Sequence, residues 1–332
     1  MRRTSLFLIV FFFALSINSF AARPDPAMGN WEGTFQTDTY ESGAIHAQVI
    51  ALGKGNYRAV ITVVYGDQEG PKVELKGKRK RKKVVFSGSV DMGYDMGGTY
   101  DVSAEIVGKK FAGHFSGYEA TGTFELIKVH KKSPTLGAAP PQNAIVLFDG
   151  TSLDKWQQVN GKPAKWKILK NGAMQVTKGS IITRQKFKDC RIHLEFRTPF
   201  KPKARGQKRG NSGVYVQARY EVQILDSFGL EGKDNECGAI YKIAAPRVNA
   251  CLPPLEWQTY DINFQAAKFA NGKKVKNAVI TVRHNGILIH DHLELPRPTG
   301  GARNKNEALP DGLMLQDHGN PVQFRNIWIV PL

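Results

Sequence analysis

Residues 210–226, near the middle of the chain, carry the spacing of polar side chains that best suits chemistry. Apolar residues recur there at alternate positions or nearly so: Val214, Val216, Tyr220, Val222 and Ile224. This alternation predicts a β-strand with one face turned to a core. The opposite face would carry Gln217, Arg219, Glu221 and Gln223. Burying such a row is costly, so it either lines a wet groove that binds a polar ligand or forms the solvent-exposed face of an antiparallel sheet.

The elements that must position this row are also predicted to be strands. Short alternating segments separated by Gly-rich turns fill residues 28–130 and 144–332, with hardly any helical periodicity. The pattern predicts an all-β chain, with a small antiparallel β domain of unknown role followed by a jelly roll. Residues 131–143 are rich in Pro and Ala, which suits neither a ladder nor a helix, so we expect a linker there. His284-Asn285-Gly286 predicts a tight hairpin.

The first 22 residues have the features of a secretory signal. Arg2 and Arg3 precede an apolar run at 6–15, and Ser19-Phe20-Ala21 forms a small-x-small cleavage site. The run is too short to span a bilayer comfortably, and no other long apolar stretch follows. The sequence therefore predicts an exported protein, periplasmic or extracellular, with no membrane span.

Export affects how the three cysteines are interpreted. In an oxidising compartment Cys237 and Cys251 could close a short loop, which leaves Cys190 over. We therefore predict a Cys237–Cys251 disulfide and a free, buried Cys190. No Cys-x-x-Cys pair is present, so a zinc site built from these residues is not expected.

The formal net charge of +18 is concentrated in two runs, at 76–83 and 201–209. Basic runs can bind nucleic acid or another polyanion. No nucleic-acid-binding motif accompanies these two, so we interpret them as solvated hairpin tips and expect no nucleic-acid partner. An acidic cell-surface polymer stays open as a partner for these basic loops.

Four motifs in the second half of the chain resemble the 3-keto-disaccharide hydrolase domain family. They occur in order at 147–156 (LFDGTSLDKW), 210–213 (GNSG), 220–226 (YEVQILD) and 315–319 (LQDHG). The resemblance covers residues 144–332 and leaves the first domain out. It implies the concanavalin-like jelly roll of legume lectins and laminarinase-type glucanases. It also implies action on sugars already oxidised at C3, whose glycosidic bond is cleaved by elimination and then hydration.

Such chemistry gives the polar residues candidate roles. A ketone at C3 acidifies the C2 proton, so one base can remove it while a cation, a metal or a hydrogen-bond donor holds the enolate oxygen. The candidate base or ligand groups are Glu221, His290 and His318. Arg219, Lys242 and Arg325 could hold the developing negative charge, and Gln223 and Gln316 suit sugar hydroxyls. The expected substrate is an oxidised saccharide.

Several of these assignments have a plainer alternative. His318 lies between Asp317 and Gly319 and could simply stabilise a turn, although the family motif favours a role in the site. His290 precedes Asp291 and His292, and this cluster could hold a divalent metal or be a solvated turn. The sequence therefore leaves the need for a metal open.

Two other functions also stay open. The segment Glu221-x-Gln223-x-x-Asp226 resembles the Glu-x-Asp-x-x-Glu strand of laminarinase-type glucanases. On a regular strand, however, Glu221 and Asp226 point to opposite faces, whereas a retaining glycosidase needs its two carboxylates about 5–5.5 Å apart. Lectins share the expected architecture, so a non-catalytic carbohydrate-binding module is the other alternative.

Overall fold

A computed structural model describes residues 23–332 except for 40, 67 and 94–97. The expected signal at 1–22 lies outside the described residues. The described chain is built of strands, with one short 3-10 turn, η2 (Gly206–Lys208), and no α-helix. Within that part of the chain, no helix has the length and apolar character needed to cross a bilayer. The all-β prediction is thus confirmed.

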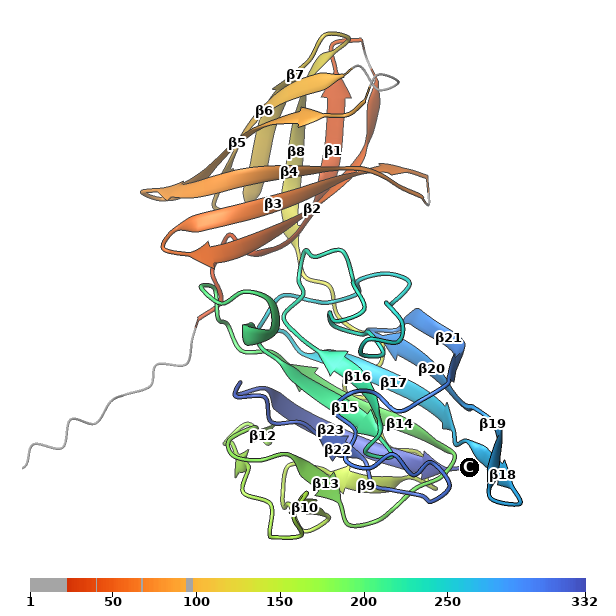
Figure 1. Ribbon diagram of the computed structural model, residues 1–332. Coiled ribbons are helices and arrows are strands. Elements are labelled where there is room, and N and C mark those ends of the chain that lie inside the picture. The colour runs from red at the N-terminus through yellow and green to blue at the C-terminus, as the bar shows by residue number, and fades with distance from the viewer. Residues whose placement is uncertain (1–22, 40, 67, 94–97) are drawn as a thin grey trace, which may run out of the picture.

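The first half of the chain forms a closed, antiparallel eight-stranded barrel (Figure 1). Each strand pairs with the next along the chain, and the last pairs back with the first. The strands are β1 (Gly29–Thr37), β2 (Ser42–Gly53), β3 (Asn56–Tyr65), β4 (Gln68–Lys80), β5 (Lys83–Asp91), β6 (Thr99–Val107), β7 (Lys110–Ser116) and β8 (Thr121–Val129). Closure leaves no unpaired edge, which is how a barrel avoids sheet-to-sheet aggregation.

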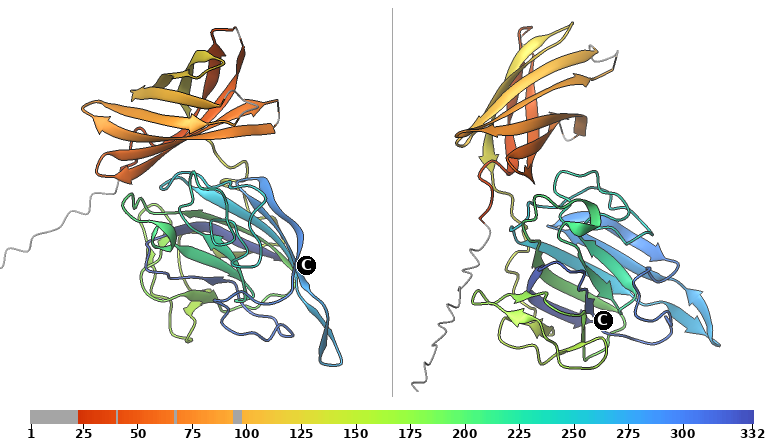
Figure 2. Two further views of the ribbon diagram at one scale, coloured as in Figure 1. Left: turned by 45° about the horizontal axis from the view of Figure 1, so that its top comes forward. Right: turned by 60° about the vertical axis from the view of Figure 1, so that its left-hand side comes forward.

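The second half forms a five-stranded and an eight-stranded sheet. The five-stranded sheet has the order β10 (Trp156–Gln158), β13 (Ile181–Thr183), β22 (Met314–Leu315), β15 (Ser212–Val216) and β16 (Tyr220–Ile224). The eight-stranded sheet has the order β11 (Lys167–Ile168), β12 (Met174–Gln175), β23 (Gln323–Pro331), β14 (Cys190–Arg197), β17 (Gln258–Gln265), β20 (Ala278–His284) and β21 (Ile287–Leu295), and β9 (Ile145–Phe148) pairs with β23. A separate hairpin, β18 (Lys268–Ala270) and β19 (Lys273–Lys276), projects from this part of the chain in the turned views (Figure 2).

Alternation along the strands divides each C-terminal sheet into a core face and an outer face. Val214 and Val222 from the five-stranded sheet share one buried apolar cluster with Leu194 and Ile262 from the eight-stranded sheet. Because successive side chains on a strand point to opposite faces, the residues between these apolar positions lie on the outer faces. The predicted hairpin at Asn285-Gly286 is confirmed, since it joins β20 and β21 with both residues at positive φ.

The stretch 210–226 is a hairpin, and the prediction of one continuous strand is wrong. β15 and β16 are paired antiparallel and joined by residues 217–219, of which Gln217 and Ala218 both have a φ of 50°. Two successive residues at positive φ form the mirror-image turn that matches the twist of a hairpin. The turn lacks the Gly or Asn that normally marks it, which is why the sequence pattern looked continuous.

The predicted Cys237–Cys251 disulfide is absent, because all three cysteines are free and buried. The two thiols lie close enough to shift each other's pKa. The Cys237 sulfur also lies 3.3 Å from the Tyr260 hydroxyl, and the Cys251 sulfur lies 3.4 Å from the Leu252 carbonyl oxygen. These contacts satisfy both thiols in the core without a covalent bond. Cys190 is free and buried, as expected.

The barrel contacts the C-terminal part through the outer surface of β2 and β3. Ile50 and Val60 pack with Phe228 in a small apolar cluster. The Arg58 guanidinium donates a hydrogen bond to the Gly229 carbonyl, and Arg205 donates to the Leu52 carbonyl at 3.2 Å. The barrel is therefore attached by side contacts as well as by the chain that links it to β9.

Candidate functional site

Four polar side chains gather on the outer face of β16, β15 and β22. Glu221 and Gln223 come from β16, Tyr215 comes from β15, and Gln316 directly follows β22. Their neighbours along each strand, such as Val222, Val214 and Leu315, are buried in the core between the sheets. The structure thus brings together three of the residues that the sequence singled out, Glu221, Gln223 and Gln316, and adds Tyr215.

Glu221 is the central titratable group of this face. It is only 4 % exposed, and burial raises its pKa to about 7, although a hydrogen bond with Tyr215 pulls the pKa the other way. A carboxyl with a pKa near neutrality is suited to proton transfer, because it can both accept and release a proton at the working pH. The pKa of the Tyr215 hydroxyl is raised by its own burial and by Glu221, so this hydroxyl stays protonated and can donate.

A glycine makes room for the Glu221 carboxylate. Gly213 is paired with Gln223 across the hairpin, and a Cβ added there would lie 2.4 Å from Glu221 Oε1. Any larger residue would displace the carboxylate. The second glycine of the GNSG motif therefore has a steric role in the site.

Three amide oxygens in this region are buried without a hydrogen-bond partner among the described residues: Asn211 Oδ1, Gln223 Oε1 and Gln316 Oε1. The amide nitrogens of the same side chains are all occupied. Those of Asn211 and Gln223 donate to Gln207 Oε1 at 2.8 and 3.0 Å, and that of Gln316 donates to the Tyr215 hydroxyl at 2.9 Å. Since an unpaired buried acceptor is costly, these oxygens are suited to accept hydrogen bonds from a polyhydroxylated ligand.

The segment 299–303 covers the site. Thr299 donates its backbone N–H and its hydroxyl to the Arg219 carbonyl at 3.0 and 2.8 Å, and its hydroxyl oxygen accepts the Glu221 N–H at 3.2 Å. Gly301 lies against Tyr215 so closely that a Cβ there would be 2.2 Å from the tyrosine hydroxyl. The segment therefore packs over the Tyr215 hydroxyl and the backbone of Glu221.

Arg219 lies at the hairpin tip and not beside Glu221 in a continuous polar row. It is 1 % exposed, and its guanidinium donates to Asn304 Oδ1 at 3.1 Å and to Gln217 Oε1 at 3.2 Å. The Asn304 amide in turn donates to Asp311 at 2.6 Å. These contacts tie the hairpin to the covering segment, so in this structure Arg219 has a positioning role.

The two candidate histidines differ in their surroundings. His318 is exposed in the turn that follows Gln316, where Asp317 accepts the backbone N–H groups of Gly179 and Gly319 at 2.8 and 2.9 Å. His290 is buried on β21 of the other sheet, with Nε2 2.7 Å from the Gly238 carbonyl oxygen. Burial lowers the pKa of His290, so its ring is neutral. His318 is thus close in sequence to the site, whereas His290 supports the loop behind it.

Two predicted substrate-binding cations are paired with acids other than Glu221. Lys242 is exposed, and its ammonium pairs with Asp234 at 3.0 Å. Arg325 belongs to β23, on the outer face of the eight-stranded sheet, where it pairs with Glu195 at 2.6 Å and lies 4.1 Å from the Trp257 ring centroid. The outer faces of the two sheets point away from the core they share, so Arg325 and Glu221 are on opposite sides of it.

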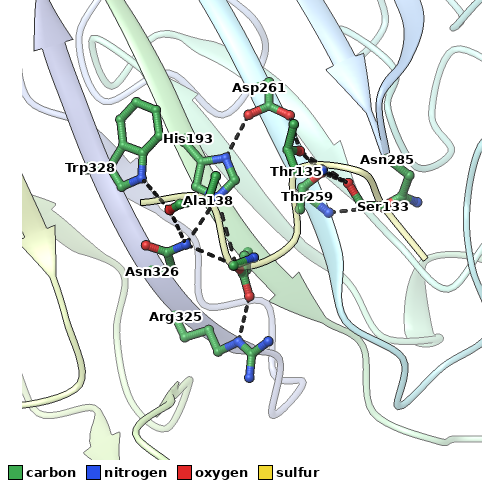
Figure 3. A network of polar contacts seen from close by, with 12 residues as sticks. Ser133, Thr135, Ala138, His193, Thr259, Asp261, Asn285, Arg325, Asn326 and Trp328 are labelled. Atoms are coloured by element: carbon green, nitrogen blue, oxygen red, sulfur yellow. Dashed lines mark hydrogen bonds and ion pairs between the residues drawn. The ribbon is translucent and has the colours of Figure 1, made fainter. Parts of the chain in front are cut away.

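The face around Arg325 binds the segment that follows the barrel (Figure 3). Glu195 Oε1 accepts the Gly137 N–H at 2.6 Å, Asn326 donates to the Ala138 carbonyl at 3.0 Å, and Thr135 donates to Asp261 at 2.6 Å. Burial alone would raise the pKa of Glu195, but hydrogen bonds from His193, Asn326, Gly137 and Arg325 lower it to about 2. This network is fully used in holding the chain, so we assign it a structural role.

Among the described residues, no cluster of metal-binding side chains accompanies Glu221, and the expected second carboxylate, Asp226, is engaged elsewhere. The described residues contain no group of three or more His, Cys, Asp or Glu side chains that could hold a metal ion. His290, Asp291 and His292 do not converge, since His290 contacts Gly238 while the exposed His292 ring contacts Asp291 at 2.6 Å. Asp226 is buried and pairs with Arg209 at 2.7 Å, so it is not the partner that a retaining glycosidase requires.

Sequence reasoning missed Tyr215 and Asn211. Tyr215 was given no role, because only residues 217–223 were assigned to the polar face of what looked like one long strand. Once the hairpin is known, its register places Tyr215 directly opposite Glu221. The signal was present, since Tyr215 has the parity of the polar face and follows Gly213 by two residues.

The outer face of this two-sheet β structure therefore carries one buried carboxyl, a tyrosine and several amides, and a few placed groups of this kind can orient a polar ligand. Residues 143–330 match the model of the 3-keto-alpha-glucoside-1,2-lyase-like domain, so the chain belongs to that family. This confirms the resemblance seen in the four motifs. The chain is therefore a carbohydrate-active protein.

Two solved structures from Parabacteroides distasonis ATCC 8503, each described as a candidate glycosyl hydrolase, are similar to this chain. The first is 36% identical, with a TM-score of 0.54, over 57% of this chain and 84% of that chain. The second is 19% identical, with a TM-score of 0.44, over 57% of this chain and 94% of that chain. A search of curated proteins found no match.

Proposed function

We propose that the chain is an exported enzyme that cleaves 3-keto-glycosides by proton abstraction at C2, elimination of the C1 substituent and hydration. The observation that carries this proposal is Glu221, a buried carboxyl with a pKa of about 7 that lies opposite Tyr215 in the hairpin, on a face with unpaired amide oxygens. The family membership and the likeness to candidate glycosyl hydrolases support a carbohydrate substrate. Within this proposal, the two C-terminal sheets form a concanavalin-like jelly roll.

In the first step, the ionised Glu221 removes the proton from C2. The electron pair of that C–H bond forms an enolate with the C3 ketone, and the enolate then expels the C1 oxygen substituent to leave a C1=C2 double bond. The proton that Glu221 holds is available to the departing oxygen. Water then adds at C1 and a proton returns to C2, so the products are the free alcohol and the 3-keto sugar.

Tyr215 suits the enolate oxygen that forms in this reaction, because its single O–H no longer has to serve the Glu221 carboxylate once Glu221 has taken the C2 proton. Its hydroxyl stays protonated because burial raises its pKa, and a neutral donor in a dry site stabilises a developing oxyanion without reorganisation. Gln223, Gln316 and Asn211 would accept the remaining sugar hydroxyls. His318, in the turn next to Gln316, would contact the part of the sugar nearest solvent.

The alternatives are less well supported. A laminarinase-like displacement needs a second carboxylate, and Asp226 is engaged with Arg209. A non-catalytic binding module would use the amide oxygens equally well, but it would have no need for a carboxyl whose pKa burial raises to about 7. The base is therefore the feature that favours an enzyme.

The test is turnover of a 3-keto-disaccharide and of the same disaccharide without the ketone, each with and without a chelator. We expect cleavage of the keto sugar alone, and no turnover by Glu221→Gln. Equal cleavage of both sugars, or binding without turnover, would refute the proposal. Loss of activity on chelation would show that the enzyme needs a metal, which no cluster of the described residues accounts for.

Export is proposed from residues 1–22 and has its own test. N-terminal sequencing of the protein secreted by its native cell should begin just after Ala21 or Ala22. A mature chain that retains Met1 would contradict export by cleavage of a signal.

A further inference from the structure

The barrel is filled at one end and hollow at the other. Trp31, Phe86 and Phe111 pack against one another near the starts of β1, β5 and β7, with ring centroids 5.8 Å apart for Trp31–Phe111 and 5.2 Å apart for Phe86–Phe111. Toward the opposite ends of these strands, the interior contains a cavity of about 740 Å³. An eight-stranded barrel is just wide enough either to be filled by side chains or to hold one small ligand, and this barrel does each at a different end.

The cavity wall is mainly apolar. Its lining includes Phe35, Ile61, Val73, Val102, Phe115 and Phe124, which come from six different strands. Phe115 makes edge-on contacts with Phe35 and Tyr100, with centroids 6.4 and 6.1 Å apart. A volume between about 300 and 1,000 Å³ with this kind of lining is typical of a small-molecule site. An apolar molecule that enters this cavity would remove apolar surface from water, which is favourable.

The mouth of the cavity is polar and acidic. Thr37, Glu41 and Glu119 line it beside the turns that follow β1 and β7. Within the described part of the chain, neither glutamate has an ion-pair partner. Burial, Glu119 and Glu41 together raise the pKa of Tyr100, which places both carboxylates within electrostatic reach of the same phenol.

Charge is distributed unevenly along the barrel axis. Residues 37–42 and 116–121, at the mouth, include three acidic residues and no Lys or Arg. The turns at the filled end, 53–56, 80–83 and 107–110, together contain seven Lys or Arg residues. A ligand held in the cavity would therefore present its polar end to an acidic rim on an otherwise basic protein. Like charges meeting there would be unfavourable.

We propose that the barrel binds one small amphipathic molecule, with its apolar body in the cavity and an uncharged or cationic end at Glu41 and Glu119. The site is separate from Glu221, because the barrel meets the C-terminal part through the outer surface of β2 and β3. The proposal therefore does not depend on the proposed sugar chemistry. It gives the N-terminal half of the chain a binding role of its own.

The test uses the full chain and the uncharged dye N-phenyl-1-naphthylamine, whose fluorescence rises in apolar surroundings. We expect saturable binding of one dye per chain. Dodecyltrimethylammonium, below its micellar concentration, should displace the dye at about a tenfold lower concentration than dodecyl sulfate. In the double variant Glu41→Gln, Glu119→Gln, this preference should disappear while the dye still binds.

A matched pair of variants locates the dye. Val73→Trp places a large ring in the cavity and should weaken dye binding at least about tenfold. Ile127→Trp places the same ring on the outside of β8, where Ile127 is 62% exposed, and should leave binding unchanged. Circular dichroism checks that the barrel is intact, and Val73→Phe replaces Val73→Trp if it is not. No saturable binding, equal binding to the filled variant, or displacement by dodecyl sulfate at least as effective as by the cation would overturn the proposal.

Discussion

Glu221 and Tyr215 are directly opposite residues in the register of the β15–β16 hairpin, and on its outer face each side chain shifts the pKa of the other. The hairpin holds both groups at fixed positions on neighbouring strands, so neither needs to be ordered when a substrate binds. Gly213, two residues before Tyr215, leaves the space that the carboxylate occupies. The base and the donor therefore come from one local element, whose backbone geometry fixes their relative positions.

Replacing Tyr215 by Phe should shift the pH dependence of catalysis to higher pH. The hydrogen bond from Tyr215 lowers the pKa of Glu221 against the effect of burial, so its loss moves the pKa above 7 and leaves less ionised base at neutral pH. If Tyr215 also holds the enolate oxygen, the rate should fall by about two to three orders of magnitude. The measurement is kcat/KM from pH 5 to 9.

The control for Tyr215→Phe is Tyr220→Phe. Tyr220 is on the core face of the same hairpin, and its hydroxyl contacts Glu307 instead of Glu221. In this variant, the pH at which kcat/KM changes should be the same as in the wild type. If the pH dependence of kcat/KM is the same in Tyr215→Phe as in the wild type, Tyr215 does not set the pKa of Glu221.

Glu221→Gln should stabilise the C-terminal part at alkaline pH. The folded-state pKa of about 7 lies above the ordinary value of 4.5, so the native state binds more protons than the unfolded state between these values. The free energy of unfolding therefore falls as the pH rises through that window. Gln lacks this penalty, so the variant should exceed the wild type by about 3 kcal/mol at pH 8 and match it at pH 4, measured by urea unfolding.

Glu195→Gln is the control with the opposite sign. Its pKa is about 2 in the folded protein against an ordinary 4.5, so its charge stabilises the fold above pH 4.5 and that stabilisation is lost as the pH falls toward 2. This variant should therefore be less stable than the wild type at pH 7 by about 3 kcal/mol. If Glu221→Gln were destabilising at pH 8, the assignment of a raised pKa would be wrong.

Gly213→Ala should inactivate the enzyme while leaving most of its stability. The added Cβ would lie 2.4 Å from Glu221 Oε1, so the carboxylate must move. A displacement of about 1 Å can cost about two orders of magnitude in rate. Gly300→Ala, in the segment near Tyr215, meets nothing within 4 Å and should retain activity within about twofold. Full activity in Gly213→Ala would show that the observed position of Glu221 is not the reactive one.

Replacing His318 should affect catalysis, whereas replacing His290 should affect stability. His318 is exposed, so His318→Ala should lower kcat/KM while the thermal midpoint stays unchanged. His290 is buried and bonded to the Gly238 carbonyl, so His290→Ala should lower stability by about 1–3 kcal/mol through the unpaired carbonyl and the lost packing. If His318→Ala has wild-type kinetics, His318 has no role in catalysis and only stabilises its turn.

The all-β class and the family could be predicted from the sequence because both depend on local patterns. Strand alternation and Gly-rich turns are visible over a few residues, and the four family motifs are contiguous. The hairpin at 217–218 was missed because its turn uses Gln and Ala at positive φ, where sequence rules look for Gly or Asn. That one error also hid Tyr215, since its role depends on the register between β15 and β16.

The position of Arg325 depends on strand pairing between distant parts of the chain, so it could not be predicted from the residues around it. Its strand, β23, pairs with β14, more than a hundred residues earlier in the chain, and this pairing puts it on the sheet opposite Glu221. The cysteine pairing failed for a related reason. Proximity of Cys237 and Cys251 was predicted from their spacing, but the thiols are satisfied by Tyr260 and by backbone carbonyls.

The most direct test of the account is the fate of deuterium at C2 of a 3-keto-disaccharide during complete cleavage by the enzyme. If Glu221 removes the C2 proton and hydration re-protonates that carbon from solvent, the released 3-keto sugar should have lost its C2 deuterium to water. A primary isotope effect on turnover should accompany this loss if the abstraction limits the rate. Complete cleavage with the deuterium retained at C2 would contradict the elimination mechanism and indicate direct displacement at C1.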